Sequence, residues 1–229
     1  MAAELDTLVV DREFHVVIPS RFPPIQLYAR IARGRDEEVA NLESLTNPRL
    51  KERGHLIAGG SDIDAASDRL QNWNHAPFAY HNPEGTRFFE KDRPALELTD
   101  CIRTALAISV RKRETFLGRT RETAMGLDMR VITRRVTGRF ADGPTMDTDL
   151  SQEERRSYGL RIALSGLDGL LFRLPGLPSA TCVSVLNGGT LGRAVQGEHF
   201  RFMWDGTRVT ELYSFSRGVS LAPEQLTAC

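Results

Sequence analysis

Arg87 and Arg30 are the residues whose type and position most suggest chemistry. Arg87 stands in NPEGTRF, directly after a turn preset by residues 82–85, between a hydroxyl and an aromatic side chain. Arg30 stands in LYARIA, residues 27–32, whose alternation is typical of a strand. Guanidinium groups bind phosphate oxygens through two parallel hydrogen bonds, so paired arginines suit a diphosphate. Taken singly, a strand arginine is more often a surface or salt-bridge residue.

Other polar clusters favour ordinary structural roles. Asp62, Asp64 and Asp68 lack the glycine and the terminal glutamate of a calcium loop, which favours a solvated helix start. Gly188 and Gly189 lack the spacing of a phosphate-binding loop, which favours a hairpin or surface loop. Three histidines are scattered without the spacing of a zinc site: His55, His75 and His81. The sequence therefore predicts no metal site.

Composition and charge exclude several classes of protein. The 229 residues are 41% hydrophobic and 26% charged, with a formal net charge of zero. This balance argues against direct nucleic-acid binding, which usually requires a basic excess, and gives no reason to bind an anionic membrane. We expect no transmembrane segment, no export signal and a cytoplasmic location. The three cysteines have neither disulfide-framework nor metal spacing, so reduced thiols are expected.

A helix over residues 101–117 is predicted to pack on the core, with Asp100 as its cap. Its apolar stripe consists of Ile102, Ala105, Leu106, Val110, Phe116 and Leu117. Ile108 lies about 120° from the centre of this stripe. In one interpretation Ile108 is a surface residue or contacts a second element. In the other it marks a side of the helix that faces a cleft.

The remaining patterns predict an α+β domain with a bent mixed sheet and flanking helices. Ser151 with Glu154 forms a capping box for a helix that Gly166 ends. A short β-like run begins at residue 14 and stops at the prolines that follow it. Strands are also predicted at 127–132, 169–174 and 181–186, with loops at 138–145 and 175–180, and Asp205-Gly206 joins a hairpin.

The sequence divides into three parts. Residues 1–13 are expected to be a leader, 14–215 a single domain, and 216–229 a loosely held tail. Residues 34–75 are polar and mixed, with short amphipathic helices expected there.

Several of these motifs resemble the RES-domain family. NPEGTRF, PALEL and TALAI resemble the family's central stretch, and SRFPPIQLYARIA resembles its opening motif. LDMRV, GLDGLLF and FMWDGTRVT follow in the family's order, so the resemblance covers most of residues 20–215. It implies a fold similar to ADP-ribosyltransferases. Characterised members of the family are toxins of bacterial toxin–antitoxin pairs that break down NAD, held in check by an antitoxin with a DNA-binding domain.

The family's pocket uses two arginines, a tyrosine, a helix glutamate and a serine. The resemblance places the arginines on Arg30 and Arg87, which it implies lie close together. The other three positions fall on residues of a different type: Leu96 or Glu97 for the tyrosine, Ile108 for the glutamate, and Leu174 for the serine. A phosphate-binding part is therefore expected to remain while the catalytic groups are lost.

The favoured hypothesis is a catalytically degenerate RES protein that binds a nucleotide or a protein partner. In the alternative, the protein is an enzyme: an active toxin that breaks down NAD with a relocated acid such as Glu97, or an enzyme with changed chemistry that uses Glu97, Glu114 or Glu122. An edge-strand charge is the ordinary role for Glu97. A third hypothesis is a purely structural or interaction protein. NAD would be a substrate or ligand rather than a cofactor. The expected partners are a helix-turn-helix antitoxin or another protein subunit, and a homo-oligomer is a further expectation.

Overall fold

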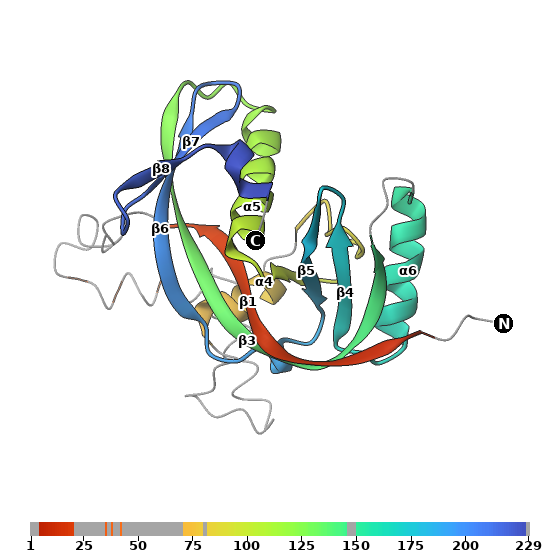
Figure 1. Cartoon of the computed structure of the whole chain (residues 1–229). Coiled ribbons are helices and arrows are strands. Elements are labelled where there is room, and N and C mark those ends of the chain that lie inside the picture. Colours follow the sequence, from red (N-terminus) through yellow and green to blue (C-terminus); the bar gives the residue numbers. More distant parts are fainter. Residues whose placement is uncertain are drawn as a thin grey trace.

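A computed structural model describes residues 5–20, 35, 38, 42, 71–79, 82–145 and 150–227 (Figure 1). Its strands are β1 Thr7–Pro19, β2 Leu96–Thr99, β3 Met125–Thr145, β4 Gly169–Leu174, β5 Leu177–Val185, β6 Val195–Trp204, β7 Val209–Ser214 and β8 Val219–Leu221. Its α-helices are α4 Asn72–Ala79, α5 Ile102–Leu117 and α6 Gln152–Leu164, and its short 3-10 helices are η2 Gly188–Thr190 and η3 Pro223–Thr227. All the strands join one mixed sheet, so the α+β prediction is confirmed.

Part of the sheet closes on itself. The strand order is β1-β2-β5-β4-β3-β6-β7-β8, and β1 also pairs with β3 from Thr7 to Pro19. The first five strands therefore form a ring, which the bridge between His15 and Thr99 completes. One core cluster takes side chains from all five of these strands: Val10, Phe14, Leu96, Leu98, Val136, Phe140, Leu171, Val183 and Val185. The β3–β4 pair is parallel and the others are antiparallel.

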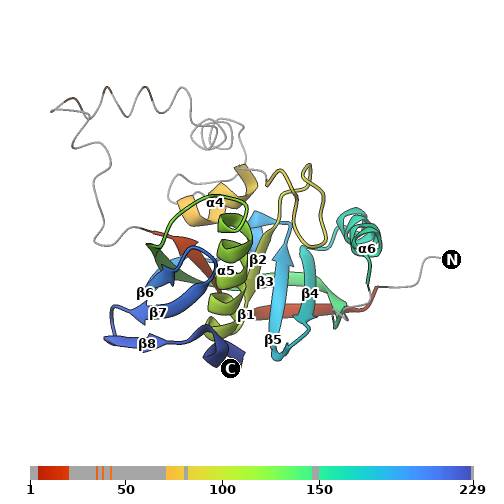
Figure 2. The ribbon, with the colours of Figure 1, turned by 90° about the horizontal axis from the view of Figure 1, so that it is seen from above.

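Two helices cover the outside of this ring at different places (Figures 1 and 2). Helix α5 buries Leu106 and Val110 against Met129 of β3 and Phe200 of β6. Helix α6 buries Ile162 with Phe88, Phe172 and Leu174 in a third cluster. The long strands β1 and β3 curve through both halves of the molecule, as Figure 1 shows. The loop from Asn82 to Pro94 and the start of β2 lie next to side chains of both α5 and α6.

The predicted leader and tail are both wrong. Strand β1 begins at Thr7 and buries Val10 and Phe14, and the polar residues between them pair outward, as Asp11 does with Arg135. The sequence pattern did not predict the first half of this strand, because only about one residue in three or four faces the core and the others are largely polar. In the tail, β8 adds to β7 and Leu226 is buried.

Two predicted loops are largely strand. Strand β3 continues through Thr145, because its second half pairs with both β1 and β4. Strand β5 already begins at Leu177. The prediction of a strand at 127–132, the α6 capping box of Ser151 with Glu154 and the hairpin between β6 and β7 are confirmed. None of the helices in the described part of the chain is long and apolar enough to span a membrane.

Helix α5 differs from its prediction at both ends. Its N-cap is Cys101, whereas Asp100 accepts a hydrogen bond from Thr181 N at 2.8 Å and pairs with Arg12. Ile102 and Phe116 are exposed, so they do not belong to the buried stripe. Cys101 is disulfide-bonded, so the expectation of reduced thiols is wrong at this position.

Candidate functional site

Arg87 stands between two hydrogen-bonded turns. Gly85 has a φ of 70° and its N–H donates to Asn82 O at 2.9 Å, as the NPEG pattern predicts. Thr86 N donates to Phe89 O at 2.8 Å, which closes a second turn around Arg87. Phe88 and Phe89 follow and are fully buried. Two buried aromatic side chains therefore anchor the loop that presents Arg87.

A small cavity of about 40 Å³ lies between this loop, α5 and the sheet. Arg87, Glu97, Ile108 and Leu174 all line it, although they come from a loop, a strand, a helix and another strand. The tertiary structure thus brings these four predicted site residues together, whereas the other candidate acids, Glu114 and Glu122, do not line the cavity. It also decides between Leu96 and Glu97, because Leu96 packs inside the ring of strands and Glu97 faces the cavity.

Glu97 is held by groups on both of its carboxylate oxygens. Oε1 accepts the backbone N–H of Arg87 at 3.1 Å, and Lys112 Nζ lies 3.4 Å from Oε2. Burial by itself raises the pKa of Glu97, but the charges of Lys112 and Arg87 and the hydrogen bonds outweigh it. The pKa of Glu97 consequently lies below its ordinary value, and the side chain is an anion at neutral pH.

Ile108 and Leu174 contribute an apolar part of the cavity wall. Ile108 is half-buried and packs in the same cluster as Phe172 and Leu174, so its off-stripe position does reflect a cleft-facing side of α5. Leu174 is buried. Neither side chain can donate or accept a hydrogen bond. The cavity itself has room for only a few water molecules.

Sequence reasoning missed several polar residues of this cavity, among them His15 and Cys182. His15 shares a hydrogen bond with Thr133 Oγ1 at 2.8 Å, and burial lowers the pKa of its imidazole. Burial raises the pKa of the Cys182 thiol to about 11, so this cysteine is not a nucleophile. His15 stands in the β-like run that begins at residue 14, where no motif marks it.

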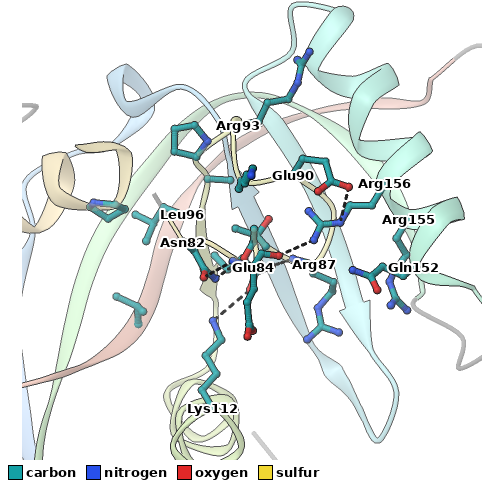
Figure 3. Close-up of a pocket in the computed structure, with 18 residues that line it drawn as sticks. Asn82, Glu84, Arg87, Glu90, Arg93, Leu96, Lys112, Gln152, Arg155 and Arg156 are labelled. Carbon is teal, nitrogen blue, oxygen red and sulfur yellow. Dashed lines mark hydrogen bonds and ion pairs between the residues drawn. The ribbon is translucent and has the colours of Figure 1, made fainter. Parts of the chain in front are cut away.

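A wide groove of about 770 Å³ adjoins the cavity and shares Val16, Arg87, Glu97 and Lys112 with it. Loop residues 82–95 form one part of its wall and the first turns of α6 another (Figure 3). Six cationic side chains line it: Arg87, Lys91, Arg93, Lys112, Arg155 and Arg156. Only three carboxylates do so: Glu84, Glu90 and Glu97. The groove is therefore electropositive.

Helix α6 approaches the Arg87 loop very closely. A Cβ at Gly159 would lie 2.0 Å from Phe88 O, so only glycine permits this contact. Arg156 donates to Glu84 O at 2.9 Å and lies against Gly85. These contacts fix Gln152 and Arg155 beside the loop, and no pattern in the sequence indicates this pairing of α6 with Arg87.

Some predictions fall outside the described residues. Arg30 lies there with the strand predicted at residues 27–32, so its expected proximity to Arg87 stays a prediction. The solvated helix start expected at Asp62, Asp64 and Asp68 also lies outside the described residues. Within the described ranges, no group of His, Cys, Asp and Glu has the arrangement of a metal site.

The chain has a curated relative over almost its whole length. It is 46% identical over 224 residues to the uncharacterized protein y4oC of Sinorhizobium fredii, which covers 97% of this chain and 96% of that protein. The chain therefore belongs to the same family as y4oC. No protein-family model matches the chain.

Proposed function

We propose that this protein binds a dinucleotide such as NAD in the electropositive groove and does not cleave it. The observation that carries the proposal is the convergence of Arg87, Glu97, Ile108 and Leu174 on one cavity at the edge of that groove. These residues stand at the family positions that the RES resemblance assigns. Their convergence supports the RES assignment and an ADP-ribosyltransferase-like fold for the bent sheet.

Arg87 is the principal ligand-binding residue in this proposal. Its Nε is buried and has no hydrogen-bond partner in the described part of the chain. A buried donor without a partner costs free energy, roughly 1–3 kcal/mol, which a bound phosphate oxygen would recover. The guanidinium also lies 5.8 Å from the centre of the Phe172 ring, which orients it.

The absence of cleavage follows from the apolar side chains in the cavity. Glycosidic cleavage passes through an oxocarbenium-like state, which a carboxylate stabilises and an isoleucine does not. By the RES resemblance, Ile108 and Leu174 fall on the two positions where that family carries its glutamate and serine. The cavity, about 40 Å³, has room for only a few water molecules.

A second candidate is an active enzyme in which Glu97 replaces the lost carboxylate. The observation in its favour is that Glu97 is ionised and lines the cavity with His15. Against it, both oxygens of Glu97 already interact with Arg87 N and Lys112. A group held in this way is suited to fixing the loop rather than to attacking a substrate.

The test is calorimetric binding of NAD to the purified protein, together with an assay for nicotinamide release. We expect measurable binding, no release, and at least about tenfold weaker binding in Arg87→Ala, because a charge-assisted hydrogen bond is lost. Arg208→Ala is the matched control, since Arg208 is exposed in the β6–β7 hairpin and does not line the groove.

The other outcomes distinguish the alternatives. Nicotinamide release that disappears in Glu97→Gln would establish the relocated-acid enzyme instead. If the protein neither binds NAD nor releases nicotinamide, the nucleotide proposal is refuted. A protein-interaction role then remains, with a helix-turn-helix antitoxin or another subunit as the expected partner.

A further inference from the structure

Positive charges outnumber negative charges among the side chains that line the groove. Each of its three carboxylates already has a cationic partner, in the pairs Glu84–Arg119, Glu90–Arg156 and Glu97–Lys112. Four lining cations have no carboxylate within 4.0 Å among the described residues: Arg87, Lys91, Arg93 and Arg155. The diphosphate of NAD carries one negative charge on each phosphate, so it would neutralise only part of this excess.

Arg155 shows the same unmet hydrogen-bonding capacity as Arg87. Its Nη1 donates to Leu150 O at 2.8 Å, which fixes the guanidinium at the start of α6. Its Nε is buried and has no acceptor in the part of the chain that the structure describes. Buried guanidinium N–H groups are normally satisfied, so this arrangement points to an anionic ligand group beside Arg155.

The two arginines lie on different walls of one groove. Figure 3 shows Arg87 extending from its loop toward the side where Gln152 and Arg155 of α6 lie. The contact between Gly159 and Phe88 O and the bond from Arg156 to Glu84 O hold α6 at this distance from the loop. Arg155 is thus a preorganised second anion-binding group, separate from the cavity that Arg87 and Glu97 share.

We propose that the groove prefers a dinucleotide with a third phosphate, such as the ribose phosphate of NADP, and that Arg155 binds this phosphate. This inference rests on the proposed function, because it assigns the ligand of the same groove. Arg87 then binds the diphosphate, and Gln152 lies beside Arg155 as a neutral hydrogen-bonding group. Lys91 and Arg93 contribute charge from the loop.

The experiment compares NAD and NADP, which differ by a single phosphate, in calorimetric titrations at one fixed ionic strength. We expect NADP to bind at least about tenfold more tightly than NAD, as one added charge-assisted contact would give. Arg155→Ala should remove most of this difference and weaken NAD binding less than about threefold. Arg87→Ala should weaken the binding of both NAD and NADP.

Arg161→Ala is the control, because it removes the same charge from α6 at a position that does not line the groove. Circular dichroism of each variant verifies that α6 remains folded. Equal affinities for NAD and NADP in the wild type, or equal loss of both in Arg155→Ala, would overturn the third-phosphate site while leaving dinucleotide binding intact. Failure of both ligands to bind would instead refute the proposed function itself, and the third-phosphate site with it.

Discussion

The backbone N–H of Arg87 donates to Oε1 of Glu97 across 3.1 Å, and this bond joins the proposed binding loop to strand β2. It gives Glu97 a structural role in a cavity where two of the predicted positions, Ile108 and Leu174, are apolar. Glu97 also pairs with Lys112, so its carboxylate serves a cation and a part-buried amide at once. The arrangement makes Glu97 a positioning residue for Arg87 in the first instance.

We therefore predict that Glu97→Ala destabilises the protein by roughly 1–3 kcal/mol, because it leaves the Arg87 amide without its acceptor. Glu97→Gln should cost less, since the amide oxygen can still accept that bond. Urea denaturation followed by circular dichroism measures both free energies of unfolding. An alanine variant as stable as the wild type would show that the bond contributes nothing.

The lowered pKa of Glu97 predicts a dependence of stability on pH. A carboxyl that ionises more readily in the folded state contributes stability above its unfolded pKa, near the ordinary value of 4.5. That contribution is lost as the pH falls through the lower pKa of the folded state. Unfolding free energies of wild type and Glu97→Gln should converge on acidification below about pH 4.5. A constant difference across this range would contradict the shift.

Ile108→Glu tests whether positions 108 and 97 share one environment. The new carboxylate would face Glu97 across the same cavity, so burial and like-charge repulsion should destabilise the fold by roughly 2–4 kcal/mol. Adding Glu97→Gln should recover part of this loss, and the double-mutant cycle measures the coupling between the two sites. Strictly additive effects would place the two side chains too far apart to interact.

Gly159→Ala should loosen the contact between α6 and the Arg87 loop. The new Cβ would lie 2.0 Å from Phe88 O, and because that neighbour is backbone, α6 or the loop must move. We expect destabilisation of about 1–3 kcal/mol, in the range of overpacked sites. Ser157→Ala, at an exposed position of the same helix, should stay within about 0.5 kcal/mol. Thermal melts of both variants measure the difference, and equal melting temperatures would refute the contact.

Cys182 should resist alkylation in the native protein. It is 1% exposed, and its pKa of about 11 leaves roughly a thousandth of it as thiolate at pH 8. Iodoacetamide labelling, read by mass spectrometry of the peptide that contains Cys182, should be negligible in buffer and complete in guanidinium chloride. Rapid labelling without denaturant would contradict both the burial and the raised pKa.

Local patterns in the sequence determined the features that depend on neighbouring residues. The capping box of Ser151 with Glu154 and the turn at Asp205-Gly206 need only a few adjacent side chains and backbone groups, so they were predictable. The turn that ends in Gly85 belongs to the same kind. The α+β class followed from the succession of such elements.

The tertiary structure alone decided which side of each element faces the site. Polar residues of β1 hid its strand, because Asp11 and its neighbours pair with β3 far along the chain. Asp100 does not cap α5, because its carboxylate accepts a hydrogen bond from Thr181 N and pairs with Arg12. The position of Arg155 beside the groove depends on the close contact between Gly159 of α6 and the carbonyl oxygen of Phe88 in the loop. Such contacts join residues far apart in sequence, whose spacing carries no local periodicity, so only packing of the whole chain fixes them.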